Sequence, residues 1–122
     1  MVSAVSLEEA ASMLEERGFI VRRYSASYVS VYGLAVKRED RIIAVSTDSR
    51  IRVIVKRAHG SEGLTLVLRL EGLRGAGRLM RELESRGGYV DAVEDRLLAV
   101  FKHANGPLLG ELVDAILGAR RT

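Results

Sequence analysis

Apolar and polar residues alternate from Phe19 to Leu70, and this period of two predicts β-strands, because successive strand residues face opposite sides of a sheet. Within residues 51–57, Ile51, Val53 and Val55 share one side, and the residues between them share the other. Five strands fit the stretch: residues 19–24, 28–37, 42–47, 51–57 and 64–70. Polar links at residues 38–40 and 48–49 predict hairpin turns, and residues 59–63 predict a looser connection. Strands joined by such short links should be antiparallel.

Helical spacing of apolar residues predicts a first helix at residues 7–17. Ser6 and Glu9 form a capping box at its start, and Gly18 supplies a residue that commonly ends helices. A second helix is expected at residues 75–86, ended by Gly87 and Gly88. The apolar sides of these two helices comprise Leu7, Ala10, Ala11 and Leu14 in the first, and Leu79, Met80 and Leu83 in the second.

A further hairpin is predicted at residues 89–93 and 97–102, around a turn at residues 94–95. Pro107 then marks the first turn of a last helix, where proline is favoured. The buried stripe expected for this helix comprises Leu108, Leu109, Leu112, Ala115 and Ile116.

The expected order of elements is therefore α-β-β-β-β-β-α-β-β-α. It predicts an α+β fold: a single, largely antiparallel sheet with helices on one face. The 122 residues suit one hydrophobic core, so residues 1–122 are expected to form a single α+β domain.

Composition narrows the chemistry. The chain has no cysteine, which excludes disulfides, thiol nucleophiles and thiolate metal sites. Sixteen arginines, eleven glutamates, a single asparagine and no glutamine are typical of hyperthermophile proteins, although a GC-rich genome also favours arginine over lysine. The net charge of +3 is therefore weak support for an anionic partner. No run of about 18 apolar residues and no signal peptide is visible, so we expect a cytoplasmic protein without membrane contact.

Catalytic and metal-binding patterns are missing. His59 and His103 are both expected in loops, far apart and without a metal-ligand spacing. The serines have no histidine nearby in the sequence to act as a base. We therefore expect no catalytic residue, no metal and no cofactor.

Basic residues suggest a partner. Arg50, Arg52, Lys56 and Arg57 are expected to form a stripe on the exposed sheet face that would suit a phosphate backbone. The stripe would be extended by Arg22, Arg23, Arg38 and Arg41 on neighbouring strands. The alternative is an ordinary solvated face, in which these cations pair with Glu39, Glu62 and Glu71. In the same way, Tyr24, Tyr28 and Tyr32 would either stack on bases or pack within the sheet.

A glycine-rich turn between the fifth strand and the second helix is a second candidate. Backbone N–H groups at Gly72, Arg74, Gly75 and Gly77 would face an anion at the helix start. The spacing matches no nucleotide-binding fingerprint. It is similar to the G-x-x-G of KH domains, but in those domains the glycines join two helices. The alternative is a tight strand-to-helix turn.

Residues 14–21 followed by Ile42–Val45 resemble the opening of restriction-endonuclease-like and archaeal junction-resolving nucleases: helix, glycine, aromatic strand, then two strands. The resemblance covers about the first third of the chain. Those enzymes place an acidic residue on the second strand and E-x-K on the third, to hold Mg²⁺ and steady the attacking water. Here the matching positions read Tyr32-Gly33-Leu34-Ala35 and Val45-Ser46-Thr47, so the resemblance implies a catalytically dead scaffold.

Three functions are left open. The leading expectation is a non-enzymatic binding or assembly module that contacts nucleic acid through the basic sheet face. The alternatives are a regulatory domain or enzyme subunit that binds a small molecule or nucleotide at the Gly72–Gly77 turn, and the dead nuclease-like scaffold. A homo-oligomer or a protein partner is also expected, because free sheet edges and an apolar last helix need protection.

Overall fold

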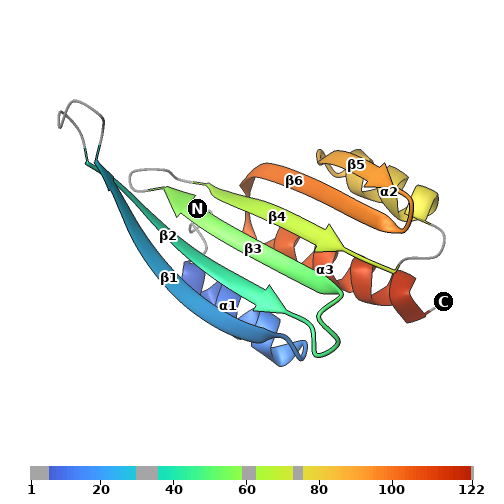
Figure 1. Ribbon diagram of the computed structural model, residues 1–122, viewed down its shortest axis with the longest axis horizontal. Helices are drawn as coiled ribbons and strands as arrows, with labels where there is room; N and C mark the ends of the chain where they lie inside the picture. The colour runs from blue at the N-terminus through green and yellow to red at the C-terminus, as the bar shows by residue number, and fades with distance from the viewer. Residues whose placement is uncertain (1–5, 30–35, 59–62, 73–75, 122) are drawn as a thin grey trace.

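The computed structural model describes residues 6–29, 36–58, 63–72 and 76–121 of the chain. In chain order their elements are α1 (Leu7–Glu16), β1 (Ile20–Val29), β2 (Val36–Val45), β3 (Ile51–Ala58), β4 (Leu64–Leu70), α2 (Ala76–Ser85), β5 (Tyr89–Val93), β6 (Arg96–Ala104) and α3 (Gly106–Arg121) (Figure 1).

The strands form one sheet in the order β1-β2-β3-β4-β6-β5, with every neighbouring pair antiparallel. Strands β1 and β5 form its edges. Only the β4–β6 pair joins strands that do not follow each other in the described chain, since α2 and β5 lie between them. The expected α+β fold, with a single antiparallel sheet and helices on one face, is confirmed.

The predicted number of strands before the second helix was wrong. Four are present among the described residues, because residues 25–27 do not interrupt β1 and the expected turn at residues 38–40 lies inside β2. In the ladder, Ser25 lies opposite Asp40, and the Ser25 hydroxyl donates a 2.8 Å hydrogen bond to Oδ1 of Asp40. Small polar residues thus continue the ladder here, because its hydrogen bonds come from the backbone. Residues 30–35, within the predicted second strand, lie outside the described residues.

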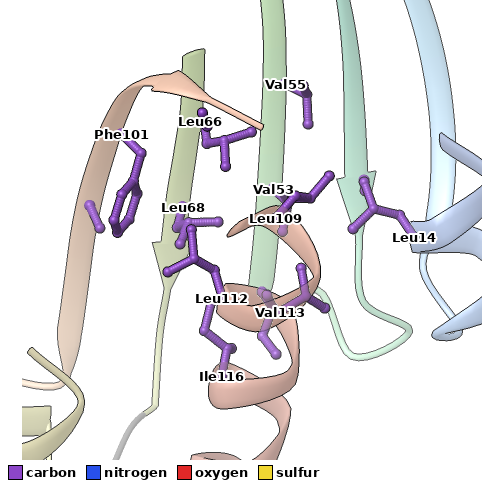
Figure 2. Close-up of a cluster of buried hydrophobic side chains, with 14 of the residues drawn as sticks. Leu14, Val53, Val55, Leu66, Leu68, Phe101, Leu109, Leu112, Val113 and Ile116 are labelled. Carbon is purple, nitrogen blue, oxygen red and sulfur yellow. The ribbon is translucent and has the colours of Figure 1, made fainter. Parts of the chain in front are cut away.

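The hydrophobic core lies between one face of the sheet and the three helices. Ala44, Val53, Leu68 and Ala99 lie side by side across four strands and are fully buried. Figure 2 shows the α3 side chains Leu109, Leu112 and Ile116 pointing at this face. In Figure 1, α1 and α3 lie behind the sheet, and α2 packs against β5 and β6. The last helix is therefore covered by its own sheet, and it needs no partner to bury its apolar stripe.

Helix ends follow local sequence signals. The Ser6 hydroxyl accepts a 3.1 Å hydrogen bond from the Glu9 N–H, as predicted, although the Ser6 N–H donates no hydrogen bond to the Glu9 carboxylate in the described structure. Gly18 and Gly87 end α1 and α2 with φ of 88° and 92°, which glycine adopts without strain. The start of α3 has a cap that the sequence reasoning missed, because Asn105 Oδ1 accepts from the Leu108 N–H at 2.9 Å. Among the helices of the described residues, none combines the length and apolarity needed to span a bilayer.

Candidate nucleic-acid interface

The side of the sheet opposite the helices carries no second layer in the described chain, and we call it the open face. Its residues alternate with the buried ones along each strand. They are Ile20, Arg22 and Tyr24 on β1; Glu39, Arg41, Ile43 and Val45 on β2; Arg52, Ile54 and Lys56 on β3; Thr65, Val67 and Arg69 on β4; Arg96, Leu98 and Val100 on β6; and Tyr89, Asp91 and Val93 on β5.

An apolar row crosses the middle of the open face. Ile43, Ile54, Val67 and Val100 lie opposite one another on β2, β3, β4 and β6, and all four side chains are partly exposed. With neighbouring strands about 4.8 Å apart, the row extends over roughly 14 Å. This part of the face therefore offers a flat apolar strip to a partner.

Cations lie in opposed pairs on both sides of this strip. Arg52 lies opposite Arg69 across β3 and β4, and Arg41 lies opposite Lys56 across β2 and β3. Like charges that face each other directly on neighbouring strands destabilise a sheet. Glu39 partly offsets the second pair through a 2.6 Å ion pair with Arg41. No ion pair within the described residues offsets the first.

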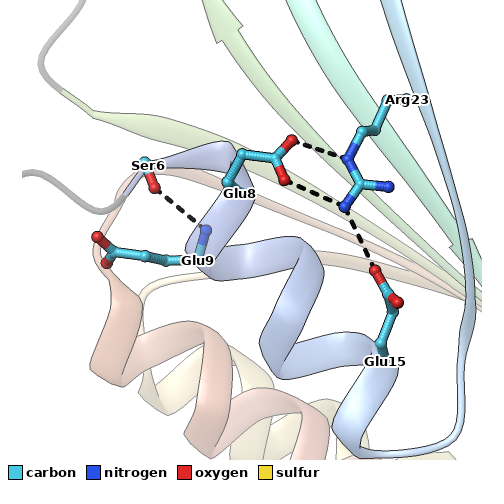
Figure 3. Close-up of polar contacts among 5 residues, drawn as sticks. All are labelled: Ser6, Glu8, Glu9, Glu15 and Arg23. Carbon is cyan, nitrogen blue, oxygen red and sulfur yellow. Dashed lines mark hydrogen bonds and ion pairs between the residues drawn. The ribbon is translucent and has the colours of Figure 1, made fainter.

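Three arginines on the helix side, by contrast, are engaged in ion pairs. Arg17 holds Asp114, joining α1 to α3 at 2.9 Å, and Arg86 holds Glu111 at 2.6 Å. Arg23 donates to both carboxylate oxygens of Glu8 at 2.7 and 3.1 Å, and to Glu15 at 3.4 Å (Figure 3). The hydrogen bonds that Arg23 donates to Glu8 lower the pKa of Glu8 and raise the pKa of Arg23.

On the open face, Arg22, Arg52, Lys56 and Arg69 form no ion pair with any described residue. The expected alternative, that Arg50, Arg52 and Lys56 pair with Glu39 and Glu71, does not hold for the described residues, because Glu39 pairs with Arg41 and Glu71 forms no ion pair with a described residue. Glu62 lies outside them. The open face thus carries four cations that remain available to an anionic partner.

Two exposed tyrosines also lie on the open face. Tyr24 on β1 is 46% exposed and lies opposite Arg41, and Tyr89 on β5 is 73% exposed and lies opposite Val100. Tyr24 is therefore not packed inside the sheet. The Tyr28 side chain and all of Tyr32, the other two candidates for stacking, lie outside what the structure describes.

The open face is hollowed at two places. The first hollow, about 470 Å³, lies over β1, β2 and β3, and its lining includes Arg22, Tyr24, Ile43, Val45 and Arg52. The second hollow, about 220 Å³, lies over β4, β6 and β5, and its lining includes Arg69, Asp91, Val93, Arg96 and Leu98. Because Arg52 lines one and Arg69 the other, the opposed arginine pair lies between the two hollows.

The predicted basic stripe divides between the two faces. Arg52 and Lys56 lie on the open face with Arg22 and Arg41, as expected. Arg57 and Arg23 lie on the helix side, which corrects the prediction for both. Arg57 lies opposite Asp40 and, two residues after the buried Val55, faces the same side of the sheet as Val55. Arg23 forms an ion pair with Glu8 of α1. The side chain of Arg38 lies outside the described residues.

Arg50 and the glycine-rich turn meet at the end of β4. The Arg50 side chain lies against Gly72, where a Cβ would come within 2.9 Å of its Nη1 atom, and the Glu71 N–H donates to the Arg50 carbonyl at 2.9 Å. Gly77 lies in the first turn of α2. Arg74 and Gly75 lie outside the described residues, so the structure leaves the predicted anion site untested.

A pocket of about 600 Å³ lies on the helix side, between the start of α1 and strands β1, β2 and β3. Most of the charged side chains that line it already have partners within the protein. Arg23 forms an ion pair with Glu8, and the Ser25 hydroxyl donates a hydrogen bond to Asp40. Arg57 lines the same pocket and has no ion pair with a described residue. The pocket therefore offers a ligand few unengaged groups.

Groups for hydrolysis or metal binding do not converge in the described structure. His103 lies within β6 and not in the expected loop, with an exposed side chain and a φ of 58° at an irregular point of the β4–β6 ladder; His59 lies outside the description. No group of three or more histidine, aspartate or glutamate side chains among the described residues is placed to hold a metal ion. At the nuclease-like position, the Ser46 hydroxyl donates to Asp48 at 2.7 Å within a turn.

Sequence reasoning missed Arg69. It is the one charged residue of β4, and alternation with Leu68 and Leu70 places it on the open face. Its position opposite Arg52 depends on the β3–β4 register, which the pattern alone does not determine.

The chain matches no known protein family, and neither a curated protein nor a solved structure shows significant similarity to it.

Proposed function

We propose that the protein is a non-enzymatic module that binds nucleic acid through the open face. The observation that carries the proposal is the Arg52–Arg69 pair, in which two exposed cations face each other without an anion to separate them. Such a pair costs stability in the free protein. A phosphate placed between the two guanidinium groups would offset the repulsion and form charge-assisted hydrogen bonds with both.

The neighbouring groups support the same partner. Arg22, Arg41 and Lys56 extend the positive charge around the apolar strip, so that a nucleic-acid backbone lying on the face would meet cations on both sides. Binding to phosphates is driven largely by release of counterions, and it weakens steeply as salt rises. A protein surface of mixed charge would respond less strongly.

The double substitution Arg52→Ser with Arg69→Ser tests the proposal. Fluorescence anisotropy with labelled DNA and RNA oligonucleotides, measured over a series of salt concentrations, reports both affinity and its salt dependence. Loss of two phosphate contacts should reduce the slope of log affinity against log salt by about 1.4 on single strands or 1.8 on duplexes. Sequence preference should barely change, because phosphate contacts do not read bases.

A matched control removes the same charge from the other side of the molecule. Arg78 and Arg81 are exposed on α2 and form no ion pair within the described residues. Their double substitution to serine should leave affinity and slope close to those of the parent protein. Equal losses in both double variants would show that net charge alone drives binding, and an unchanged slope in the open-face variant would refute the proposal.

A second candidate role is self-assembly through the sheet edges. Five large apolar side chains are exposed in the described structure, and four of them lie on the edge strands: Ile20 and Tyr24 on β1, and Tyr89 and Val93 on β5. Edge strands with apolar side chains favour pairing with another chain. Light scattering should then show a dimer or larger species that Val93→Lys converts to a monomer. A monomer at every concentration would exclude this role and leave nucleic-acid binding unaffected.

A further inference from the structure

We propose that the open face binds single-stranded nucleic acid, with a backbone phosphate at the Arg52–Arg69 pair and an unstacked base in the first hollow beside Tyr24. This inference rests on the proposed function and narrows it to one class of nucleic acid.

The chemistry of the first hollow fits a base. Tyr24 provides an aromatic ring, Arg22 and Arg52 provide planar guanidinium groups, and the floor is aliphatic. Aromatic and guanidinium planes are the groups on which proteins stack unpaired bases. The volume of about 470 Å³ falls in the range of small-molecule sites.

A duplex would use this surface poorly. Its bases are stacked on one another, so it presents phosphates and groove edges and no base faces to a flat sheet. The phosphates of a duplex would neutralise the cations of the open face. Tyr24 and the apolar strip, however, would contact the charged sugar-phosphate backbone of the duplex and no base faces. An unpaired strand satisfies both kinds of group, because its bases turn toward apolar and aromatic side chains while its phosphates lie on cations.

The order of groups along the face gives the strand a path. In one row across the sheet, the register places Val45 of the first hollow, then Arg52 and Arg69, then Leu98 of the second hollow. A phosphate at the arginine pair would direct its two neighbouring nucleotides toward the two hollows. In the second hollow, Asp91 and Arg96 offer an acceptor and donors for a base edge.

Anisotropy titrations with a labelled 20-nucleotide DNA, its RNA counterpart and a 20-base-pair duplex of the same sequence test the inference over a series of salt concentrations. The single strands should bind more tightly than the duplex. Tyr24→Ala should weaken single-strand binding roughly five- to 150-fold, the range for loss of one stacked base. It should leave duplex affinity and the salt slope unchanged, since no phosphate contact is removed. Tyr24→Phe, which keeps the ring, should bind like the parent.

Tyr89→Ala is the matched control, because Tyr89 is an exposed tyrosine on the same face that lines neither hollow. It should weaken binding less than Tyr24→Ala. Equal effects of the two variants, or duplex binding as tight as single-strand binding, would overturn the inference while leaving the proposed function intact. Absence of salt-dependent binding to all three probes would refute the proposed function itself. Since Tyr24 is exposed, a melting curve suffices to show that its variants are folded.

Discussion

Gly88 lies directly against the ring of Phe101: a Cβ added at Gly88 would stand 2.5 Å from Cζ of that buried ring. The approach brings the start of β5 onto β6. We expect Gly88→Ala to lower the free energy of unfolding by about 1–3 kcal/mol, the usual cost of overpacking a core. Urea denaturation followed by circular dichroism measures it.

Gly77→Ala is the control for this variant. Gly77 lies in the first turn of α2, and an added Cβ would meet no atom within 4 Å. Alanine there should raise stability by about 0.5–1 kcal/mol, because it restricts the unfolded chain and favours helix. Similar losses in both variants would contradict the assignment of the Gly88 effect to the Phe101 contact.

Reversing one charge of the opposed arginine pair should stabilise the protein. Arg52→Glu places a carboxylate opposite Arg69, and a cross-strand pair of opposite charge contributes about 0.2–1 kcal/mol. Denaturation at low salt should show the gain, and 1 M salt should reduce it by screening. Arg52→Ser should give a smaller gain. A loss of stability in both variants would contradict the inference that the two arginines repel each other.

The Ser6 cap is expected to stabilise α1. Its hydroxyl accepts the Glu9 N–H, so Ser6→Ala leaves that donor without a protein partner and should lower the free energy of unfolding by about 1 kcal/mol. Ser12→Ala replaces an exposed serine in the middle of the same helix and should be neutral or slightly stabilising. Thermal melts of the two variants provide the comparison.

The Arg17–Asp114 ion pair makes stability depend on pH. Hydrogen bonds from Arg17 lower the pKa of Asp114 below its ordinary value of 3.8. The unfolded chain therefore binds this proton more readily than the folded one, so the contribution is complete above the ordinary pKa and is lost as pH falls through the folded pKa. Denaturation measured from pH 7 down to pH 2 should show a smaller acid loss in Asp114→Asn than in the parent.

Glu84→Gln is the control for the pH series. Glu84 is an exposed carboxylate of α2 that forms no ion pair within the described residues. This variant should retain the acid loss that Asp114→Asn reduces. If both variants follow the parent, the α1–α3 ion pair contributes nothing measurable, as is common for exposed pairs.

Most of the fold could be predicted from the alternation of apolar and polar residues along the strands. Ile51, Val53 and Val55 are buried together, as their spacing indicated, and the helix ends at Gly18 and Gly87 follow from the glycines alone. The error in strand number came from residues 25–27 and 38–40, of which all but Ala26 are polar. They resemble turns in composition, but here they face each other in the ladder between β1 and β2, and residues 39–40 also pair with β3.

The candidate site was predicted in part. Strict alternation would have separated Arg23 and Arg57 from the basic stripe, because they follow Val21 and Val55 by two residues. The sequence pattern could not predict that Arg52 lies opposite Arg69. This pairing depends on the β3–β4 register, which is set by the number of residues that connect the two strands. The same holds for the two hollows, which gather side chains from three strands each.

The β4–β6 pairing has a consequence for how the protein is made. Strands β1 to β4 leave the ribosome in the order in which they pair, so this part of the sheet can form as it emerges. The outer edge of β4 then stays unpaired until α2, β5 and β6 have followed. This strand carries Leu64, Leu66, Leu68 and Leu70. Until β6 arrives, that edge is an open template for another nascent chain. Pairing of β6 with β4 is therefore the step that closes this edge to neighbouring chains.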